Sequence, residues 1–333
     1  MLFELRRVGG TLVVRTAIAV VGLVGCILVF HRWGGGQVWS GRRAAEAIHV
    51  RPEGTRAVAV WGSSNVREAL DVRDLEMLDR GSARMWFNFS ESGLTGVALL
   101  CEVRQFVESL PEGSLEAICL EILPDPADEQ PLTWRTARYV PLSDAVTAHR
   151  ETLKSPCPKS PSAWHARRLI EHGLMRSTAG LHALLYPDAS DAAIIDFRAG
   201  GGKSTTATSL DAEWLRLQEE KERMNRAVLA GEPPVPCSPT LSAWLLEELQ
   251  HACAARGIRL IPVLVPTADA AGACAVVNAT LGEPPLLLDG GQERSPFIQE
   301  DLLADPVHVN ARGADLVTAA FHREFLKRIT GQP

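Results

Sequence analysis

Short apolar runs alternate with amphipathic stretches along most of this chain, and this alternation limits its fold more than any other feature. Runs that are apolar throughout are typical of strands in a parallel sheet, and the stretches between them have helical spacing. The predicted strands are Arg56–Trp61, Arg84–Phe89, Leu115–Leu123, Ile258–Val265 and Pro285–Asp289. The predicted helices are Thr95–Leu110, Leu241–Arg256 and Asn310–Ile329. The sequence therefore predicts a three-layer α/β/α sandwich with a mostly parallel sheet.

The segment from about 125 to 240 interrupts this alternation. It contains helical stretches around 160–185 and 211–230, separated by loops rich in proline and glycine. We interpret it as a helical insertion into the α/β domain, which spans 56–330. The charged run over 219–223 is expected to form a solvated helix face.

The N-terminus carries a strongly apolar run, Thr16–Phe30, which Leu12, Val13 and Val14 extend. This length crosses a bilayer if the intervening Arg15 snorkels to the interface. The run predicts a single-pass transmembrane signal anchor over 11–31, after a cytoplasmic tail over 1–10 and before a linker over 32–55. Through 11–31 the partner of the chain would be the lipid bilayer.

Three other interpretations of this run stay open. It is also compatible with a cleaved signal peptide, with a lipid-modified cysteine in the sequence Leu23-Val24-Gly25-Cys26, and with a buried soluble helix. Arginines lie on both sides of the run, so the positive-inside rule does not settle its orientation. The cytoplasmic placement of 1–10 follows mainly from a family resemblance.

Composition excludes several classes of function. Hydrophobic residues make up 46% of the 333 residues and charged residues 22%, which are values of a folded protein. The net charge of −6 argues against nucleic acid as a partner. The glycine-rich Gly200–Thr205 stretch lacks the first glycine of a phosphate-binding loop, because Phe197 stands there. The seven cysteines form no regular framework, and no metal or cofactor is expected.

Two clusters carry candidate chemistry. Ser63 and Ser64 follow the first predicted strand, where a serine on a tight strand-to-helix turn projects its hydroxyl at the sheet edge. Asp305 precedes His308 by three residues, a spacing that lets a carboxylate orient an imidazole as a general base. Each cluster alone also fits a purely structural role. The serine can be a helix N-cap, and Asp305 and His308 can be a surface pair beside a helix cap.

Together the clusters resemble the SGNH/GDSL hydrolase family. The stretch DPVHVNARGADLVTAAFHREF is similar to the last block of that family, and VAVWGSSNVREAL to the serine block of its membrane-anchored branches. The stretch FNFSESG resembles the second block. The resemblance covers roughly 55–125 and 255–330. It departs from the family pattern after the third strand, where the usual asparagine is absent.

The resemblance implies a role for each matching residue. Ser64 would be the nucleophile, His308 the general base and Asp305 the residue that orients the imidazole. The backbone N–H groups of Ser64 and Gly93 would form the oxyanion hole, with Gly96 as the second choice for Gly93.

The same resemblance implies a function at the membrane. We expect a serine esterase or O-acyltransferase that modifies an exported polysaccharide or a small acyl ester, with its domain on the periplasmic side. The anchored relatives of alginate acetylation and teichoic acid D-alanylation imply a membrane-bound O-acyltransferase as partner. Export would permit Cys157 and Cys237 to pair, whereas Cys101 and Cys119 are expected to be packed thiols. The alternative is a catalytically degenerate domain that serves as a scaffold in a membrane complex.

Overall fold

A five-stranded parallel sheet forms the centre of the computed structural model, which describes residues 22, 25, 40–91, 96–123, 140–154, 167–175, 210–232, 242–268 and 271–331. The strands are β1 (Arg56–Trp61), β2 (Arg84–Asn88), β3 (Ala117–Glu121), β4 (Arg259–Leu264) and β5 (Leu286–Leu287). Their spatial order is β2-β1-β3-β4-β5, and every pair is parallel. The predicted α/β fold is confirmed at this level.

The order of the strands reverses at one place in the sheet. The chain adds β2 on one side of β1 and then β3, β4 and β5 on the other side, so the reversal lies between β1 and β3. In open parallel sheets, ligands bind outside the carboxyl ends of the strands at such a reversal. The segments that follow β1 and β3 are therefore the first place to look for a site.

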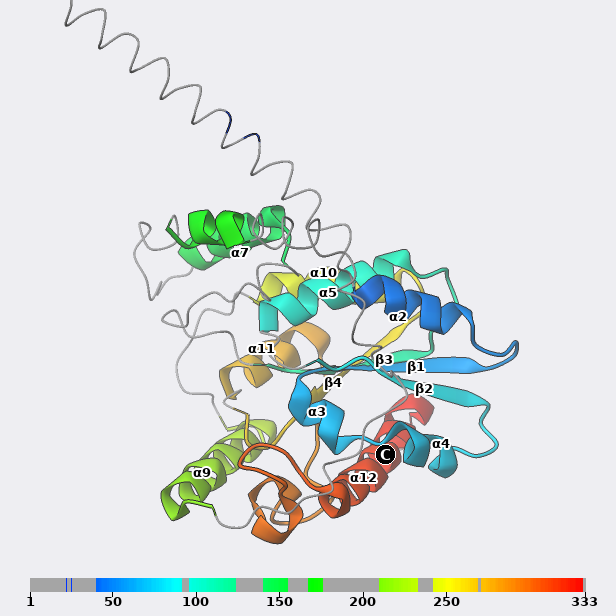
Figure 1. Cartoon of the computed structure of the whole chain (residues 1–333), viewed down its shortest axis with the longest axis vertical. Coiled ribbons are helices and arrows are strands. Elements are labelled where there is room, and N and C mark those ends of the chain that lie inside the picture. The colour runs from blue at the N-terminus through cyan, green and yellow to red at the C-terminus, as the bar shows by residue number, and fades with distance from the viewer. Residues whose placement is uncertain are drawn as a thin grey trace, which may run out of the picture.

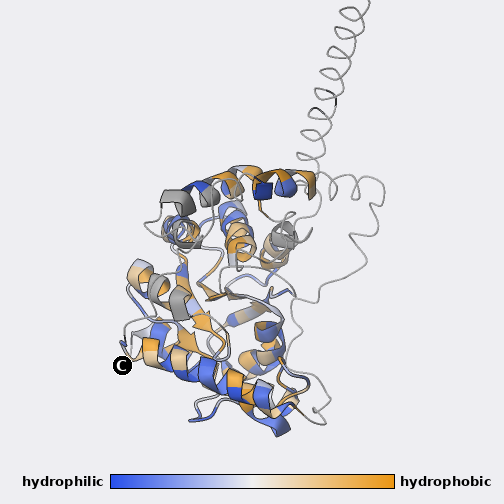
Figure 2. Cartoon of the chain, turned by 90° about the vertical axis from the view of Figure 1, so that its left-hand side faces the viewer, coloured by the Kyte–Doolittle hydropathy of each residue, from blue (hydrophilic) through white to orange (hydrophobic). Residues whose placement is uncertain are grey.

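Helices cover both faces of the sheet (Figure 1). One face carries α2 (Ser40–His49), α5 (Gly96–Ser109) and α10 (Ser242–Ala254), and the other carries α3 (Ser64–Ala69), α4 (Val72–Leu78) and α12 (Ala311–Thr330). Each set packs its own apolar cluster against the strands. Figure 2 shows hydrophobic residues gathered along the strands and mixed colours on the helices around them.

The predicted linker over 32–55 requires a correction, because residues 40–49 form α2. Ala44, Ala45 and Ile48 of this helix are fully or almost fully buried and belong to the same core cluster as α5. Their spacing places them on one helix face. The glycines and arginines around this short stripe hide it in the sequence.

The segment predicted as a helical insertion is described only in parts, which are α7 (Leu142–Lys154), a helical stretch over 167–175 and α9 (Ala212–Leu229). In the charged run of α9, Glu219, Glu220 and Arg223 are exposed, as predicted. Glu222 is the exception, since it is buried and accepts hydrogen bonds from the Oγ–H of Ser295 at 2.9 Å and from Arg226 at 2.7 Å. Cys101 and Cys119 are buried free thiols, as predicted. Cys157 and Cys237 lie outside the described residues.

The predicted anchor over 11–31 also lies outside the described residues, except for Gly22 and Gly25, which are helical. Within the described part of the chain, no helix has both the length and the apolar character needed to cross a bilayer.

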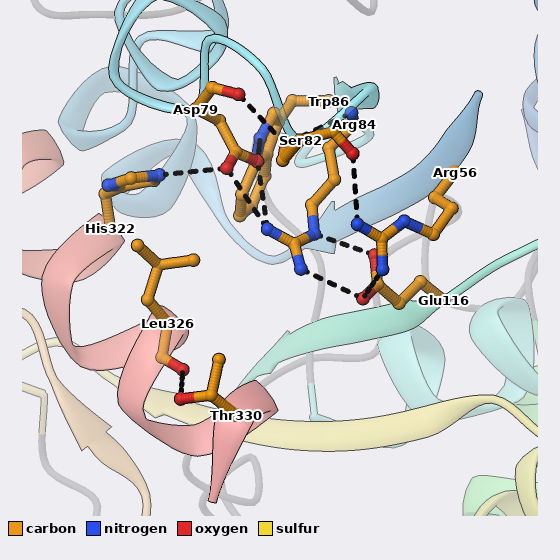
Figure 3. A network of polar contacts seen from close by, with 9 residues as sticks. All are labelled: Arg56, Asp79, Ser82, Arg84, Trp86, Glu116, His322, Leu326 and Thr330. Atoms are coloured by element: carbon orange, nitrogen blue, oxygen red, sulfur yellow. Dashed lines mark hydrogen bonds and ion pairs between the residues drawn. The ribbon is translucent and has the colours of Figure 1, made fainter. Parts of the chain in front are cut away.

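A buried ionic network joins the amino ends of the strands to α4 and α12 (Figure 3). Arg84 at the start of β2 donates to Glu116 through Nε at 2.8 Å and to Asp79 through Nη1 at 3.1 Å. Asp79 also accepts the indole N–H of Trp86 at 3.2 Å, and its Oδ1 lies 3.6 Å from His322 Nε2 on α12. The side chains of Arg84, Asp79 and His322 are each less than 10% exposed, so this network is part of the core.

Candidate active site

The turn after β1 presents two serines in different ways. Ser63 is the N-cap of α3, with an extended backbone (φ −82°, ψ −176°), and its Oγ accepts the N–H of Asn65 at 3.2 Å. Ser64 is the first residue of the helix. Because the first N–H groups of a helix have no acceptor within it, the Ser64 N–H points out of the helix end. The turn thus separates a capping serine from a serine that faces outward.

Ser64 contacts a histidine from the other end of the sequence. Its Oγ lies 2.9 Å from Nε2 of His308, and Nδ1 of His308 lies 2.8 and 2.9 Å from the two carboxylate oxygens of Asp305. With Nδ1–H donating to the carboxylate, Nε2 accepts the Ser64 hydroxyl proton. The structure therefore brings Ser64, His308 and Asp305 together in a continuous hydrogen-bonded chain.

The loop that carries His308 is held by its own hydrogen bonds. Oδ1 of Asp305 accepts the backbone N–H groups of Val307 and His308, each at 3.0 Å. The N–H of Ala304 donates to the His308 carbonyl at 2.8 Å, which closes the loop at its base. Asn310 then caps α12 by accepting the N–H of Gly313 at 3.1 Å. The carboxylate therefore orients both the imidazole and the backbone beneath it.

His308 and Asp305 are both partly exposed to solvent. The side chain of His308 is 15% exposed and that of Asp305 is 32% exposed. A base that is partly open in this way can exchange protons with a ligand while its position stays fixed.

The predicted oxyanion hole is described in part. Ser64, the expected first donor, is the first residue of α3, a position at which a backbone N–H has no acceptor within the helix. Gly93, the expected second donor, lies outside the described residues. Gly96, the second choice, is the first residue of α5 and is buried.

A buried glutamate that the sequence interpretation missed lies directly behind the serine turn. Glu121 is the last residue of β3 and is 3% exposed. Its Oε2 accepts the N–H of Ser63 in a short hydrogen bond, and its Oε1 accepts the Oγ–H of Ser63 at 3.1 Å. A charged residue at the end of an otherwise apolar strand is the signal that marks it in the sequence.

Burial raises the pKa of Glu121 to about 7, although the two hydrogen bonds from Ser63 oppose the shift. We expect this to produce a pH-dependent loss of stability that the Glu121→Gln variant lacks. The unfolded carboxyl ionises near pH 4.5, so between that pH and 7 only the folded state keeps the proton. Stability is therefore full below pH 4.5 and is lost as the pH rises through 7, by about 3 kcal/mol at about 1.4 kcal/mol per pKa unit.

Urea unfolding of both proteins across pH 4.5–8 tests this expectation. The difference between wild type and variant isolates Glu121, because every other group titrates in both proteins. A difference that stays constant over this range would contradict the prediction.

Within the described ranges, no group of three or more histidine, cysteine, aspartate or glutamate side chains is placed to hold a metal ion. The chain matches no protein-family model and no curated protein. The case for a function therefore rests on the site itself.

Proposed function

We propose that this chain is a membrane-anchored serine esterase or O-acyltransferase of the SGNH type. The observation that carries the proposal is the Ser64–His308–Asp305 chain of hydrogen bonds at the carboxyl edge of a parallel sheet. It lies next to the reversal in strand order, which supports a ligand site at this edge. The finer fold belongs to the proposal too, namely a three-layer SGNH-like domain with a helical insertion.

The geometry supports acyl transfer in two steps. The Ser64 Oγ attacks the acyl carbonyl while Nε2 of His308 takes the hydroxyl proton, and the Ser64 N–H stabilises the oxyanion. The imidazolium then protonates the leaving alcohol as the ester bond breaks and an acyl-serine forms. In the second step an acceptor hydroxyl, from water or a sugar, loses its proton to His308 while its oxygen attacks the acyl-serine carbonyl. The bond between that carbonyl and the Ser64 Oγ then breaks, the acyl group stays on the acceptor, and the imidazolium returns the proton to Ser64. Asp305 stabilises the imidazolium in both steps.

The location and the partners are part of the same proposal. Residues 11–31 would anchor the chain in the bilayer, with the domain on the extracytoplasmic side. The substrate would be an acyl ester of an exported glycan, and a membrane-bound O-acyltransferase would supply the acyl group. These elements rest on the family resemblance and on the apolar N-terminal run.

One observation favours a second candidate, a scaffold domain without activity. The family asparagine that donates to the oxyanion is absent at the end of β3, where Glu121 is the last residue of the strand and Ile122 and Leu123 follow it. A site that lacks this donor has fewer groups to stabilise a tetrahedral intermediate.

Covalent labelling separates the two candidates. The full-length chain in mild detergent is treated with a fluorophosphonate probe, and the adduct is located by peptide mass spectrometry. We expect an adduct on Ser64, none in Ser64→Ala, and labelling at least about 10³-fold slower in His308→Ala. Ser63→Ala tests only which of the two serines is modified: Ser63 contacts Glu121 rather than His308, so the adduct should still be on Ser64. A folded wild type that stays unlabelled, or an adduct on another serine, would overturn the catalytic proposal.

A further inference from the structure

The position of Ser64 depends on the conformation of the turn between β1 and α3. The turn consists of Gly62 and Ser63, and its backbone sets the direction in which the Ser64 Oγ leaves the helix. The contact to His308 Nε2 at 2.9 Å leaves little room for a change in that direction. Whatever holds Ser63 in place therefore also holds the nucleophile.

Ser63 is held by a single side chain from a neighbouring strand. Both of its donors, the backbone N–H and the Oγ–H, point to the two oxygens of the Glu121 carboxyl group. The Ser63 Oγ in turn accepts the Asn65 N–H at 3.2 Å, so the contact extends into the first turn of α3. The route runs from β3 through Ser63 to the helix that carries Ser64.

Gly62 makes this close approach possible. A Cβ atom at this position would lie 2.6 Å from Glu121 Oε2, 2.9 Å from Glu121 Cβ and 2.9 Å from Val66 Cβ. Atoms at such distances clash, so the space that the missing side chain leaves is filled by the glutamate. The glycine, the glutamate and the serine thus form one packed unit beneath the nucleophile.

We infer that Glu121 is a positioning residue for Ser64, which through its two contacts with Ser63 fixes the turn so that the Ser64 hydroxyl meets His308. This inference rests on the proposed function, because it assigns a role in the chemistry of Ser64. Among the described residues, the hydrogen bonds of the Glu121 carboxyl group come from Ser63, so we assign its effect on Ser64 to that contact. The carboxyl group works as a hydrogen-bonding partner of Ser63, and an amide of the same size provides the same two contacts.

Two substitutions of Glu121 separate this role from general stability. In Glu121→Gln the amide oxygen accepts the Ser63 N–H and the amide NH₂ donates to the Ser63 Oγ, so the turn keeps its conformation. In Glu121→Leu both partners of Ser63 are lost while the volume stays similar. We expect Glu121→Gln to be labelled by the fluorophosphonate within about threefold of the wild-type rate. Glu121→Leu should be labelled about 10²-fold more slowly, because a displacement of about 1 Å has about this effect.

Glu222→Leu serves as the matched control. Glu222 is another buried glutamate that accepts both the N–H and the Oγ–H of one serine, Ser295, at 3.4 and 2.9 Å. Its substitution removes the same kind of contact elsewhere in the fold. We expect Glu222→Leu to be labelled at the wild-type rate.

Hydrogen–deuterium exchange provides a readout that does not require activity. The Ser63 amide is protected by Glu121 in the structure. In the peptide over 61–66, we expect exchange to become about 10- to 100-fold faster in Glu121→Leu, because this substitution leaves the Ser63 N–H without an acceptor. In Glu121→Gln the amide oxygen still accepts that N–H, so exchange should stay unchanged. Circular dichroism and a cooperative thermal transition establish that each variant is folded. If Glu121→Leu does not fold, Ser63→Ala removes one of the two contacts and should slow labelling about tenfold, since the loss of one hydrogen bond has about this effect.

The outcomes are distinct. Slow labelling and fast exchange in Glu121→Leu, with both at the wild-type level in Glu121→Gln, support the inference. Labelling of Glu121→Leu, or of Ser63→Ala in its place, at the wild-type rate overturns the inference and leaves the proposed function standing. A wild type that is folded but unlabelled overturns the proposed function and the inference with it.

Discussion

Replacing Asp305 by asparagine should lower the rate of fluorophosphonate labelling of Ser64 by about 10⁴-fold at neutral pH, the effect of this change in other Ser-His-Asp triads. The reason lies in the charge of the carboxylate. Both of its oxygens lie within 2.9 Å of His308 Nδ1, where they stabilise the imidazolium that forms when Nε2 takes the serine proton. An amide carries no charge and can present its NH₂ group to Nδ1, which favours the wrong tautomer.

We expect the backbone of the loop that carries His308 to keep its conformation in Asp305→Asn. The Oδ1 of asparagine still accepts the N–H groups of Val307 and His308, as the aspartate does at 3.0 Å. Asp301→Asn is the matched control, since Asp301 belongs to the preceding segment and its side chain is 66% exposed. We expect that control to be labelled like the wild type. An Asp305→Asn variant that is labelled within threefold of the wild-type rate would show that the carboxylate does not assist His308.

Replacing Arg84 by methionine should lower the free energy of unfolding by about 3–5 kcal/mol, because it leaves buried carboxylates without their cation. Arg84 is 6% exposed and contacts Glu116 through both Nε and Nη2, at 2.8 and 3.1 Å. Asp79, whose side chain is 4% exposed, loses the same partner. Methionine preserves most of the apolar contact with Phe325, over whose ring the guanidinium lies at 5.8 Å. The expected loss of stability therefore comes from the missing positive charge rather than from a change in side-chain volume.

Urea unfolding at pH 7 measures this effect, with Arg216→Met as the control. Arg216 also pairs with a glutamate, Glu213, at 2.8 Å, but both side chains are about 60% exposed. Exposed pairs contribute about 0–1 kcal/mol, so the control should unfold close to the wild type. Equal effects of the two substitutions would contradict a role for burial in the network.

The strands and the three triad positions could be predicted from the sequence because each depends on local pattern. A run such as RAVAVW is apolar at nearly every position, which is typical of a strand covered on both faces. Asp305 and His308 lie within one loop, where a spacing of three residues sets their contact. The choice of Ser64 over Ser63 came from the family resemblance, and the coordinates agree with it, since Ser64 contacts His308 while Ser63 contacts Glu121.

The features that escaped prediction depend on partners that are distant in the sequence. Glu121 is 58 positions from Ser63, and no local pattern relates a strand end to a turn on the neighbouring strand. The helix α2 has a stripe of only three small or medium apolar residues, whose burial requires α5 as a partner. The run of charges around Glu222 predicts an exposed residue. In the structure Glu222 is buried and contacts Ser295, which is 73 positions away in the sequence.

The distance along the chain between Ser64 and His308, 244 positions, has a consequence for folding. The same gap is closed a second time at Thr318 of α12, whose Oγ1 accepts the Asp71 N–H at 3.0 Å and donates to the Ala69 carbonyl at 3.2 Å. Contacts of such high contact order are made only after a large loss of loop entropy, and they are slow to form. A folding intermediate in which α12 has not docked therefore has no activated serine. On the proposed function, the rate at which a reactive Ser64 appears during refolding therefore measures the rate at which α12 docks.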